Sequence, residues 1–516
     1  MVVLPWAQWL LSGAMTHKSD QIEIDWLKRW AQYSPKAVAM KDADSQRSVS
    51  YLEFFERSKN IAQVLRDRFS ITHGDRVAVL AVNEIETVFL FFALQRLGAI
   101  LVPVNYRLTP REVGHILADS QAKVLFYQEA FAECVCKVNI DKLKTFSFEK
   151  DLTAQLWREP NAAAPEAFDA NFETPVMILY TSGTTGAPKG VVLTHKMLFW
   201  NSVTTALRLN LTQNDRTLIF HPFFHTSGLN VLTTPLIHHG GSIVFLKKFD
   251  AAKVLELAEQ EKISILFGVP TMMDMMFHSE QFPKVSLESV RYAIVGGEPM
   301  PVPLIQKWEE KGVPVRQGFG LTEFGPNVFS LNEEDSIRKI GSIGFPNFYI
   351  DTQVITKDGL MAKAGEVGEL HLRGPMCMAG YWNNEEATKA TVQDSWLATG
   401  DLVRFDEESY FYVVGRKKDM FISGAENVYP AEVESFLRTH PAIREVAVLG
   451  VKDEKWGEVG KAFVSLQPGK NISEDELKKF CCGNLAKYKI PKYFTFLTEL
   501  PKGDSGKILK RALITA

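Results

Sequence analysis

Short apolar runs alternate with helix-forming stretches through much of the chain, and this alternation most constrains its fold. Runs typical of buried strands lie at residues 76–82, 99–104, 123–127, 217–220, 242–245, 263–267 and 292–295. The segments between them are long enough for crossover helices, so consecutive strands can run in the same direction. Strand, helix and strand at this spacing predict largely parallel sheets covered by helices, and therefore an α/β fold.

Local signals mark where two of these helices begin and end. Asn83 with Glu86 has the pattern of a capping box, and Gly98 is a suitable helix terminator. Thr109 is a good N-cap, and Pro110 suits the first helical position. We therefore expect helices to begin after residue 83 and after residue 109.

The chain is too long for a single core. At 516 residues it exceeds the size at which one hydrophobic core stops growing, so at least two domains are expected. From residue 416 the pattern changes to a compact α+β unit, with a helix from Ala431, strands at 446–451 and 461–466, and a helix capped by Ser473. We predict a large N-terminal domain, residues 1–415, and a small C-terminal domain, residues 416–516.

Composition excludes several classes of function. A net charge of −3 gives no basic face for nucleic acid. None of the five cysteines forms a C-x-x-C pair, which disfavours a zinc site or a disulfide framework and favours a reducing, cytoplasmic location. The apolar residues 1–15 lack a basic flank and are too short to span a bilayer. An upstream start ahead of Met15, a packed helix or a membrane-surface helix could each account for them.

Residues 180–190, Tyr-Thr-Ser-Gly-Thr-Thr-Gly-Ala-Pro-Lys-Gly, form a loop between two apolar runs. Its glycines allow backbone N–H groups to turn inward, its hydroxyls add donors, and Lys189 adds a positive charge. These features predict a phosphate-binding loop. It is not of the Walker type, because Gly190 rather than Ser or Thr follows the lysine.

This loop resembles the phosphate-binding signature of the acyl-adenylate-forming superfamily, which includes acyl-CoA synthetases and adenylation domains. The resemblance covers nearly the whole chain, with motifs in the family's order from Tyr180 to Lys507. It implies that ATP phosphates contact Thr181, Ser182, Gly183, Thr184, Thr185, Gly186 and Lys189. It also implies that Thr184 and Glu323 hold Mg²⁺, which usually takes few protein oxygens and completes its shell with phosphates and water.

Further motifs are similar to the family's nucleotide-binding segments. In Phe319-Gly320-Leu-Thr322-Glu323, the phenyl ring would stack on adenine where many members carry Tyr, and Thr322 would contact the α-phosphate. The turn Gly296-Gly297-Glu298 corresponds to an adenine-binding turn that lets the backbone approach the base. Asp401 would accept both ribose hydroxyls, and Arg416 would reach the ribose or a phosphate.

The remaining motifs concern the acid, CoA and domain motion. By resemblance, His225 of His-Pro-Phe-Phe-His lines the acyl pocket, whereas His221 carries little weight. Lys507 would stabilise the charge that develops at the α-phosphate. The segment 420–434, which contains Gly424, would meet CoA, and Lys418 corresponds to the hinge about which a mobile C-terminal domain turns.

These motifs predict an ATP-dependent carboxylate–CoA ligase whose substrates are ATP, CoA and a small carboxylic acid. The candidate pocket residues offer no Arg or Lys for a second carboxylate, which favours an apolar acid such as a fatty acid; they are His225, Leu229, Val231, Phe267, Val269, Met272, Met273 and Phe324. An aryl-acid CoA ligase and a stand-alone adenylation module that loads a carrier protein are the alternatives. The sequence leaves the oligomeric state open, with a homodimer as one option.

Overall fold

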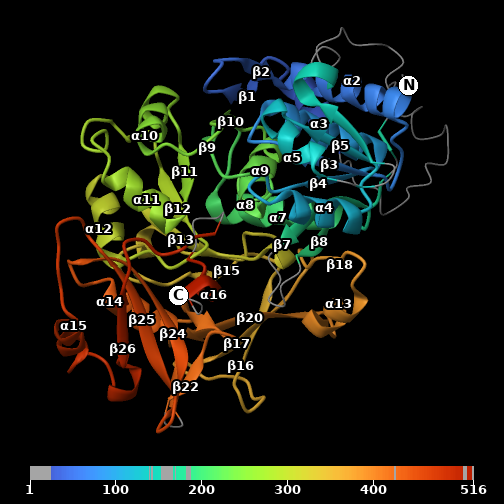
Figure 1. The fold of residues 1–516 in the computed structure, drawn as a ribbon. Coiled ribbons are helices and arrows are strands. Elements are labelled where there is room, and N and C mark those ends of the chain that lie inside the picture. Colours follow the sequence, from blue (N-terminus) through green and yellow to red (C-terminus); the bar gives the residue numbers. More distant parts are fainter. Residues whose placement is uncertain are drawn as a thin grey trace, which may run out of the picture.

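Two large sheets form the body of the molecule (Figure 1). The computed structural model describes residues 25–138, 140, 143–152, 167, 168, 170–181, 188–423, 426–503 and 508–513. Seven of the predicted site residues lie outside this range: Ser182, Gly183, Thr184, Thr185, Gly186, Gly424 and Lys507. The structure therefore places the two arms of the phosphate loop but not its tip.

The first large sheet has nine strands within the described residues, in the order β15-β14-β13-β12-β11-β9-β10-β1-β2. Its strands are β1 (Val38–Asp42), β2 (Ser48–Ser50), β9 (Arg216–Ile219), β10 (Ser242–Phe245), β11 (Ile265–Gly268), β12 (Tyr292–Val295), β13 (Val315–Phe319), β14 (Phe329–Ser330) and β15 (Phe345–Pro346). From β13 to β1 every neighbouring pair is parallel. The predicted parallel α/β architecture is therefore confirmed.

The second large sheet has seven strands in the described part of the chain, in the order β18-β8-β7-β4-β3-β5-β6. Its strands are β3 (Arg76–Leu80), β4 (Ile100–Pro103), β5 (Val124–Tyr127), β6 (Lys144–Ser147), β7 (Pro175–Thr181), β8 (Lys189–Thr194) and β18 (Gly380–Tyr381). Strands β7 and β8 pair antiparallel and carry the two arms of the phosphate loop, with Thr181 opposite Lys189.

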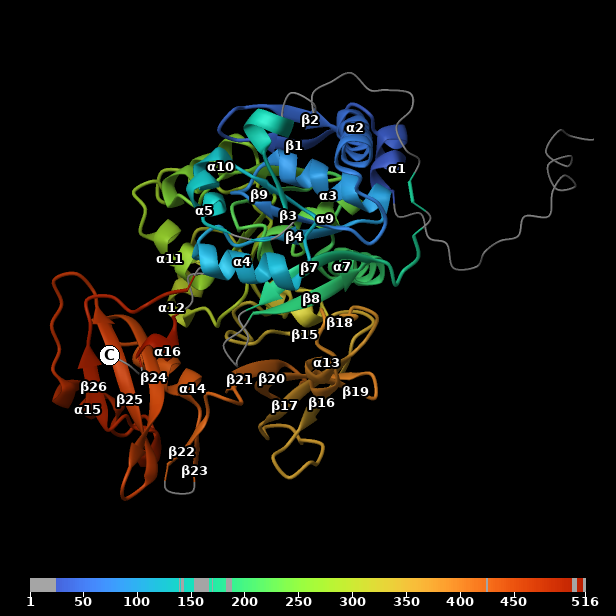
Figure 2. The same cartoon turned by 45° about the vertical axis from the view of Figure 1, so that its right-hand side comes forward.

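Two smaller sheets follow in the sequence. One contains β16 (Asp351–Ile355), β17 (Gly368–Arg373), β19 (Val392–Gln393), β20 (Trp396–Phe405) and β21 (Phe411–Arg416). The other contains β22 (Phe421–Ser423), β23 (Glu426–Val428), β24 (Ile443–Asp453), β25 (Gly457–Leu466) and β26 (Tyr493–Phe496). Figure 2 shows this last sheet, orange to red, as a unit beside the body. Sequence patterns predicted the last sheet but not the one that precedes it.

Helices cover the sheets and lie between them. They are α1 (Trp26–Tyr33), α2 (Tyr51–Phe69), α3 (Ile85–Leu97), α4 (Pro110–Asp119), α5 (Ala132–Cys136), α7 (His195–Leu209), α8 (Thr226–Leu229), α9 (Thr233–His238), α10 (Ala251–Gln260), α11 (Pro270–Phe277), α12 (Val302–Glu310), α13 (Glu385–Thr391), α14 (Pro430–Leu437), α15 (Glu474–Cys481) and α16 (Lys510–Leu513). In the described part of the chain, no helix combines the length and apolar character needed to cross a membrane.

Helix α3 shows how the core forms between the two large sheets. It is apolar around its whole circumference, and nearly all of its residues are buried. A helix of this composition must be covered on every side, and α3 contacts both β1 of one sheet and β4 of the other. The largest hydrophobic cluster accordingly contains side chains from both sheets.

The predicted helix boundaries were correct in one case and partly wrong in the other. Thr109 and Glu112 form the predicted capping box at the start of α4. Gly98 ends α3 with φ +64°, as expected, but the capping box of Asn83 and Glu86 is absent because Glu84 occupies the N-cap position. The Asn83 side chain instead bonds the carbonyl of His221 at 2.8 Å, a contact that local sequence cannot reveal.

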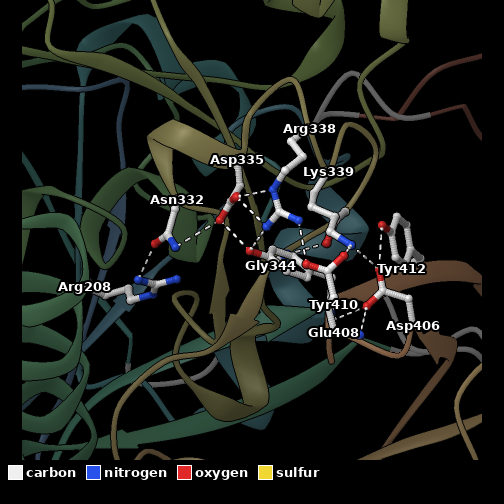
Figure 3. A network of polar contacts seen from close by, with 11 residues as sticks. Arg208, Asn332, Asp335, Arg338, Lys339, Gly344, Asp406, Glu408, Tyr410 and Tyr412 are labelled. Atoms are coloured by element: carbon white, nitrogen blue, oxygen red, sulfur yellow. Dashed lines mark hydrogen bonds and ion pairs between the residues drawn. The ribbon is translucent and has the colours of Figure 1, made fainter.

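A dense polar network joins the β20–β21 hairpin to the body (Figure 3). Arg338 binds Asp335 at 2.8 Å and Glu408 at 2.6 Å, while the Tyr410 hydroxyl donates to Asp335 at 2.5 Å. Burial opposes ionisation of Asp335, but hydrogen bonds from Tyr410 and Arg338 hold the pKa of its carboxyl below the usual range. Lys339 adds a bond to Asp406 at 2.9 Å. This network fixes the hairpin that carries Asp401 and Arg416.

Candidate functional site

The predicted nucleotide-binding residues gather at one edge of the nine-stranded sheet. Strands β9, β11, β12 and β13 are successive parallel neighbours, so their carboxyl ends lie side by side. The segments that follow β9 and β12 contain His221 to His225 and Gly296 to Glu298, and Phe319 at the end of β13 leads into Gly320 to Glu323. In open α/β sheets this edge is where ligands bind.

The Gly296-Gly297 turn follows β12, and the backbone conformation of its second residue favours glycine. Gly297 has φ +88°, in the left-handed region that favours glycine. At Gly296 a Cβ atom would lie 3.4 Å from the Gly318 carbonyl oxygen of the neighbouring strand. Glu298, the next residue, is half-buried.

Phe319 ends β13 and is half-buried. Its ring packs edge-on against Phe329 of the antiparallel neighbour β14, with 5.9 Å between ring centroids. The next residue must be glycine, because a Cβ at Gly320 would lie 1.9 Å from the Pro326 carbonyl oxygen. The tight turn directs the chain into the short 3₁₀ helix of Thr322, Glu323 and Phe324.

Glu323 is oriented by a residue that the sequence motifs did not reveal. The Tyr381 hydroxyl donates to Glu323 Oε1 at 3.1 Å, and Lys189 Nζ lies 5.1 Å from the centroid of the Tyr381 ring. Burial and the negative charge of Glu323 raise the pKa of Tyr381, so its hydroxyl stays protonated and donates. Tyr381 pairs with Val191 across β18 and β8, which links the phosphate-loop arm to the Glu323 turn.

Asp401 and Arg416 lie directly opposite each other on β20 and β21. Arg416 Nε lies 2.7 Å from Asp401 Oδ1, and the Asp401 carboxylate is nearly buried while Arg416 is half exposed. The Asp401 backbone N–H donates to Thr399 Oγ1 at 3.0 Å, which holds the turn. The hairpin thus pairs the two residues that the sequence assigned to ribose.

The segment after Arg416 leads into the C-terminal unit. Lys417 Nζ binds Glu369 Oε2 of β17 at 2.7 Å, and the Lys417 N–H donates to the Gly400 carbonyl. The His371 ring, with Nε2 at 3.8 Å from Glu369 Oε2, and the contact with Lys417 lower the pKa of Glu369 to about 2. Lys418, the predicted hinge residue, is exposed.

The two histidines after β9 have different environments. His221 is buried, stacked on Phe267 with 4.2 Å between ring centroids, and burial with the nearby His225 lowers its pKa to about 3. His225 is half-buried and precedes α8. A Cβ at Gly228 would lie 2.4 Å from the Pro222 carbonyl oxygen, so the loop between them is tightly folded. Because His221 is buried and His225 only half-buried, His225 is the more accessible of the two histidines.

Comparison with known proteins identifies the family. The model of the AMP-binding enzyme family matches residues 27–382, and the model of its C-terminal domain matches residues 432–507. The chain belongs to the AMP-binding enzymes. The resemblance inferred from the motifs is thereby confirmed, as is the class of activity, an AMP-forming acid–thiol ligase.

Relatives of this AMP-binding enzyme act on different acids. The chain is 38% identical over 491 residues to a feruloyl-CoA synthase of an Amycolatopsis species, covering 94% of this chain and 97% of the relative. It is 36% identical over 494 residues to the long-chain-fatty-acid–CoA ligase FadD13 of Mycobacterium tuberculosis, covering 95% and 97%.

A solved relative has the same fold. It is the o-succinylbenzoate coenzyme A synthetase of Bacillus subtilis in complex with ATP and a magnesium ion. The two structures superpose with a TM-score of 0.84 at 34% identity, covering 95% of this chain and 99% of the other. The relatives named here are carboxylate–CoA ligases, and their names span aryl and fatty acids.

Most of the described site residues converge on this edge of the AMP-binding enzyme. Phe319 ends β13, Gly320, Thr322 and Glu323 follow it, the glycine turn follows β12, and His225 follows β9. Tyr381 was missed because 58 residues separate it from Glu323 and no local pattern connects them. Its only sequence signal is the aromatic pair Tyr381-Trp382 after a glycine.

Proposed function

We propose that this protein is an ATP-dependent carboxylate–CoA ligase acting on an apolar monocarboxylic acid. In the first step a carboxylate oxygen attacks the α-phosphate of ATP, giving acyl-AMP and pyrophosphate. In the second, the thiol of CoA displaces AMP and leaves the acyl group as a thioester. The observation that carries the proposal is the convergence of the Gly297 turn, Phe319 and Glu323 at the carboxyl edge of one sheet.

The proposed roles follow from the chemistry of the side chains. The Phe319 ring offers a face for adenine, and the Asp401 carboxylate can accept ribose hydroxyl protons. We assign Thr181 and Lys189, which lie opposite each other at the two arms of the phosphate loop, to the triphosphate. We assign Thr322 to the α-phosphate, Lys507 to the charge that develops there, and His225 to the carboxylate end of the acid.

The residues present fit a magnesium ion. Glu323 is a carboxylate held in one orientation by Tyr381. Among the described residues no cluster of three or more His, Cys, Asp or Glu could form an all-protein site. Mg²⁺ typically binds one or two protein carboxylates together with substrate phosphates and water. We assign Glu323 and Thr184 as its protein ligands; the ion would neutralise phosphate charge.

An apolar acid is supported by the pocket candidates. Leu229, Val231, Phe267 and Phe324 are buried and lie in the cluster between the two large sheets. Met273 does not belong to this group, because it packs in the cluster on the opposite face of the nine-stranded sheet. Pockets of this composition bind apolar bodies. An aromatic acid is a second candidate, supported by the similarity to a feruloyl-CoA synthase.

CoA is the proposed acceptor rather than a carrier protein, since the relatives named above are CoA ligases or synthetases. We assign the segment around Gly424 to CoA and the domain boundary to residues 415 and 416. With its hinge at Lys418, the C-terminal unit would present Lys507 in one step and the CoA segment in the other.

We propose a cytoplasmic location for this enzyme.

A screen of acids tests the proposed function. The purified protein is mixed with MgATP and acids of graded length and aromaticity, with and without CoA. Pyrophosphate release and acyl-CoA formation are both measured. We expect at least one monocarboxylate to give acyl-CoA only when CoA is present. Release of pyrophosphate without any thioester, together with transfer to a carrier protein, would refute the CoA assignment.

A further inference from the structure

Asp119, the last residue of α4, contacts the base of the phosphate loop. The Tyr180 hydroxyl donates to Asp119 Oδ2 at 2.5 Å, and Tyr180 directly precedes Thr181 on β7. The pairing of β7 with β8 sets Tyr180 opposite Gly190 and Thr181 opposite Lys189. The contact from α4 therefore holds the strand pair at the point where the phosphate loop leaves it.

A second contact joins Asp119 to the segment of β18. The indole Nε1 of Trp382 donates to the Asp119 backbone carbonyl at 3.0 Å, and the Trp382 N–H donates to the Gly190 carbonyl at 2.7 Å. Trp382 directly follows Tyr381, whose hydroxyl donates to Glu323. Asp119 is therefore bonded both to the start of the phosphate loop and to the segment that orients Glu323.

Gly190 shows how closely these parts pack. A Cβ atom at Gly190 would lie 2.7 Å from Ile178 Cγ2, 3.1 Å from Tyr180 Cζ and 3.3 Å from Trp382 Cβ. The missing side chain leaves room for the Tyr180 ring and for Trp382, the two residues that bond Asp119. The residue that distinguishes this loop from the Walker type thus has a packing role at the base of the loop.

The hydrogen bond between Tyr180 and Asp119 has the features of a strong one. Its acceptor is a carboxylate, and hydrogen bonds to charged acceptors are stronger than those between neutral groups. Both side chains are half-buried. Burial, followed by the hydrogen bond to Asp119 and its charge, raises the pKa of Tyr180, so the hydroxyl stays protonated and donates. The helix dipole disfavours a negative charge at the C-terminal end of α4, so helix stability does not account for Asp119.

We propose that Asp119 is a positioning residue for ATP, which holds the phosphate loop and Glu323 in a fixed relative position so that both engage one triphosphate with its magnesium ion. The proposal rests on the ligase function and on the assignment of the loop to phosphate. Asp119 is assigned no contact with substrate, because it acts through Tyr180 and Trp382. It should therefore matter for adenylation, where ATP is bound. It should not matter for thioester formation, because acyl-AMP has lost the β- and γ-phosphates.

The test uses Tyr180→Phe, Asp119→Leu and the double variant, assayed for pyrophosphate release with an acid that is active in the screen. Each should raise the KM for ATP about tenfold, a factor that the loss of one hydrogen bond to a charged acceptor can produce. The KM for the acid and the rate of thioester formation from supplied acyl-AMP should stay within about twofold of wild type. The double variant should lose no more than either single variant, because all three lack the same bond. Asp119→Asn keeps an acceptor oxygen and should give a KM for ATP between those of wild type and Asp119→Leu.

Tyr51→Phe is the matched control. The buried Tyr51 hydroxyl donates to the Gly241 carbonyl at 2.8 Å, and Gly241 immediately precedes β10. This bond lies at the amino-terminal edge of the parallel strands, opposite the edge where the nucleotide-binding residues gather. Tyr51→Phe should lower the free energy of unfolding in urea but leave the KM for ATP unchanged. An unchanged KM for ATP in Tyr180→Phe, an equal rise in Tyr51→Phe, or additive losses in the double variant overturns the proposal.

ATP binding by calorimetry separates this proposal from the assignments on which it rests. If no acid releases pyrophosphate, the ligase function fails, and the dissociation constants of ATP and AMP decide the role of Asp119. Weaker binding of ATP but not of AMP by Tyr180→Phe supports the proposal, also if Asp119→Leu does not fold. Unchanged ATP binding by Lys189→Ala refutes the phosphate assignment and the proposal with it. Weaker ATP binding by Lys189→Ala with unchanged binding by Tyr180→Phe overturns the role of Asp119 alone.

Discussion

Replacing Tyr381 by Phe removes one hydrogen bond from the proposed magnesium site while keeping the shape of the ring. The hydroxyl donates to Glu323 Oε1 at 3.1 Å, and both residues are half-buried. A hydrogen bond to a charged group contributes about 1.5–3 kcal/mol, and partial exposure favours the lower limit. If this free energy orients Glu323 for the metal, the magnesium concentration for half-maximal activity should rise about tenfold, since 1.4 kcal/mol corresponds to that factor.

The assay is pyrophosphate release at saturating ATP and acid over a range of magnesium concentrations. Tyr410→Phe is the matched control, because it also removes a tyrosine-to-carboxylate bond, from Tyr410 to Asp335 at 2.5 Å. That bond belongs to the network under the β20–β21 hairpin, so its loss should lower stability in urea without changing the magnesium requirement. Superimposable magnesium curves for Tyr381→Phe and wild type would refute the orienting role of Tyr381.

Four further outcomes are expected. Lys507→Ala should nearly abolish adenylation while sparing thioester formation from supplied acyl-AMP; an equal loss in both half-reactions would contradict its assignment. Glu323→Gln should raise the magnesium concentration needed for half-maximal activity, because an amide is a poorer ligand for a hard cation. Identical magnesium titrations of the variant and the wild type would show that Glu323 does not bind the metal. Lys418→Pro should keep acyl-AMP formation and stop the CoA step, since proline fixes φ at the hinge; acyl-CoA formed at the wild-type rate would argue against a hinge. The pKa of Glu369 is lowered from 4.5 to about 2, so the stability it contributes is present above pH 4.5 and lost as pH falls towards 2. In Glu369→Gln, the free energy of unfolding measured in urea should therefore fall less steeply between pH 4.5 and pH 2 than in the wild type. The same pH dependence in both proteins would show that other carboxylates cause the loss of stability.

Local structure in this chain follows from local sequence where the interacting atoms are close in sequence. The capping box of Thr109 and Glu112 and the left-handed stop at Gly98 both formed as expected. Strands β10 and β12 occupy the predicted residues, because a continuous apolar run suits a strand buried on both faces. Motif order identified the family, since each motif is short and contiguous.

Long-range contacts decided the rest. Asn83 has the sequence pattern of a cap, yet its side chain bonds His221 and Phe223, which are 138 and 140 residues away. A local cap and a distant carbonyl compete for the same amide, and only the packed fold determines which one wins. The sheet formed by β16, β17, β19, β20 and β21 was likewise unforeseen, because its central pair, β17 with β20, joins strands that are not consecutive in the chain.

The sequence by itself determined the α/β class, the family and the order of the nucleotide-binding motifs in this protein. The tertiary structure alone placed Tyr381 on Glu323, moved Met273 to the other face of the sheet and joined Asp119 to Tyr180. These features depend on which side chains meet after the two large sheets pack around α3. Motifs record residues that are neighbours in the chain, whereas hydrogen-bond partners and pocket walls are set by neighbours in space.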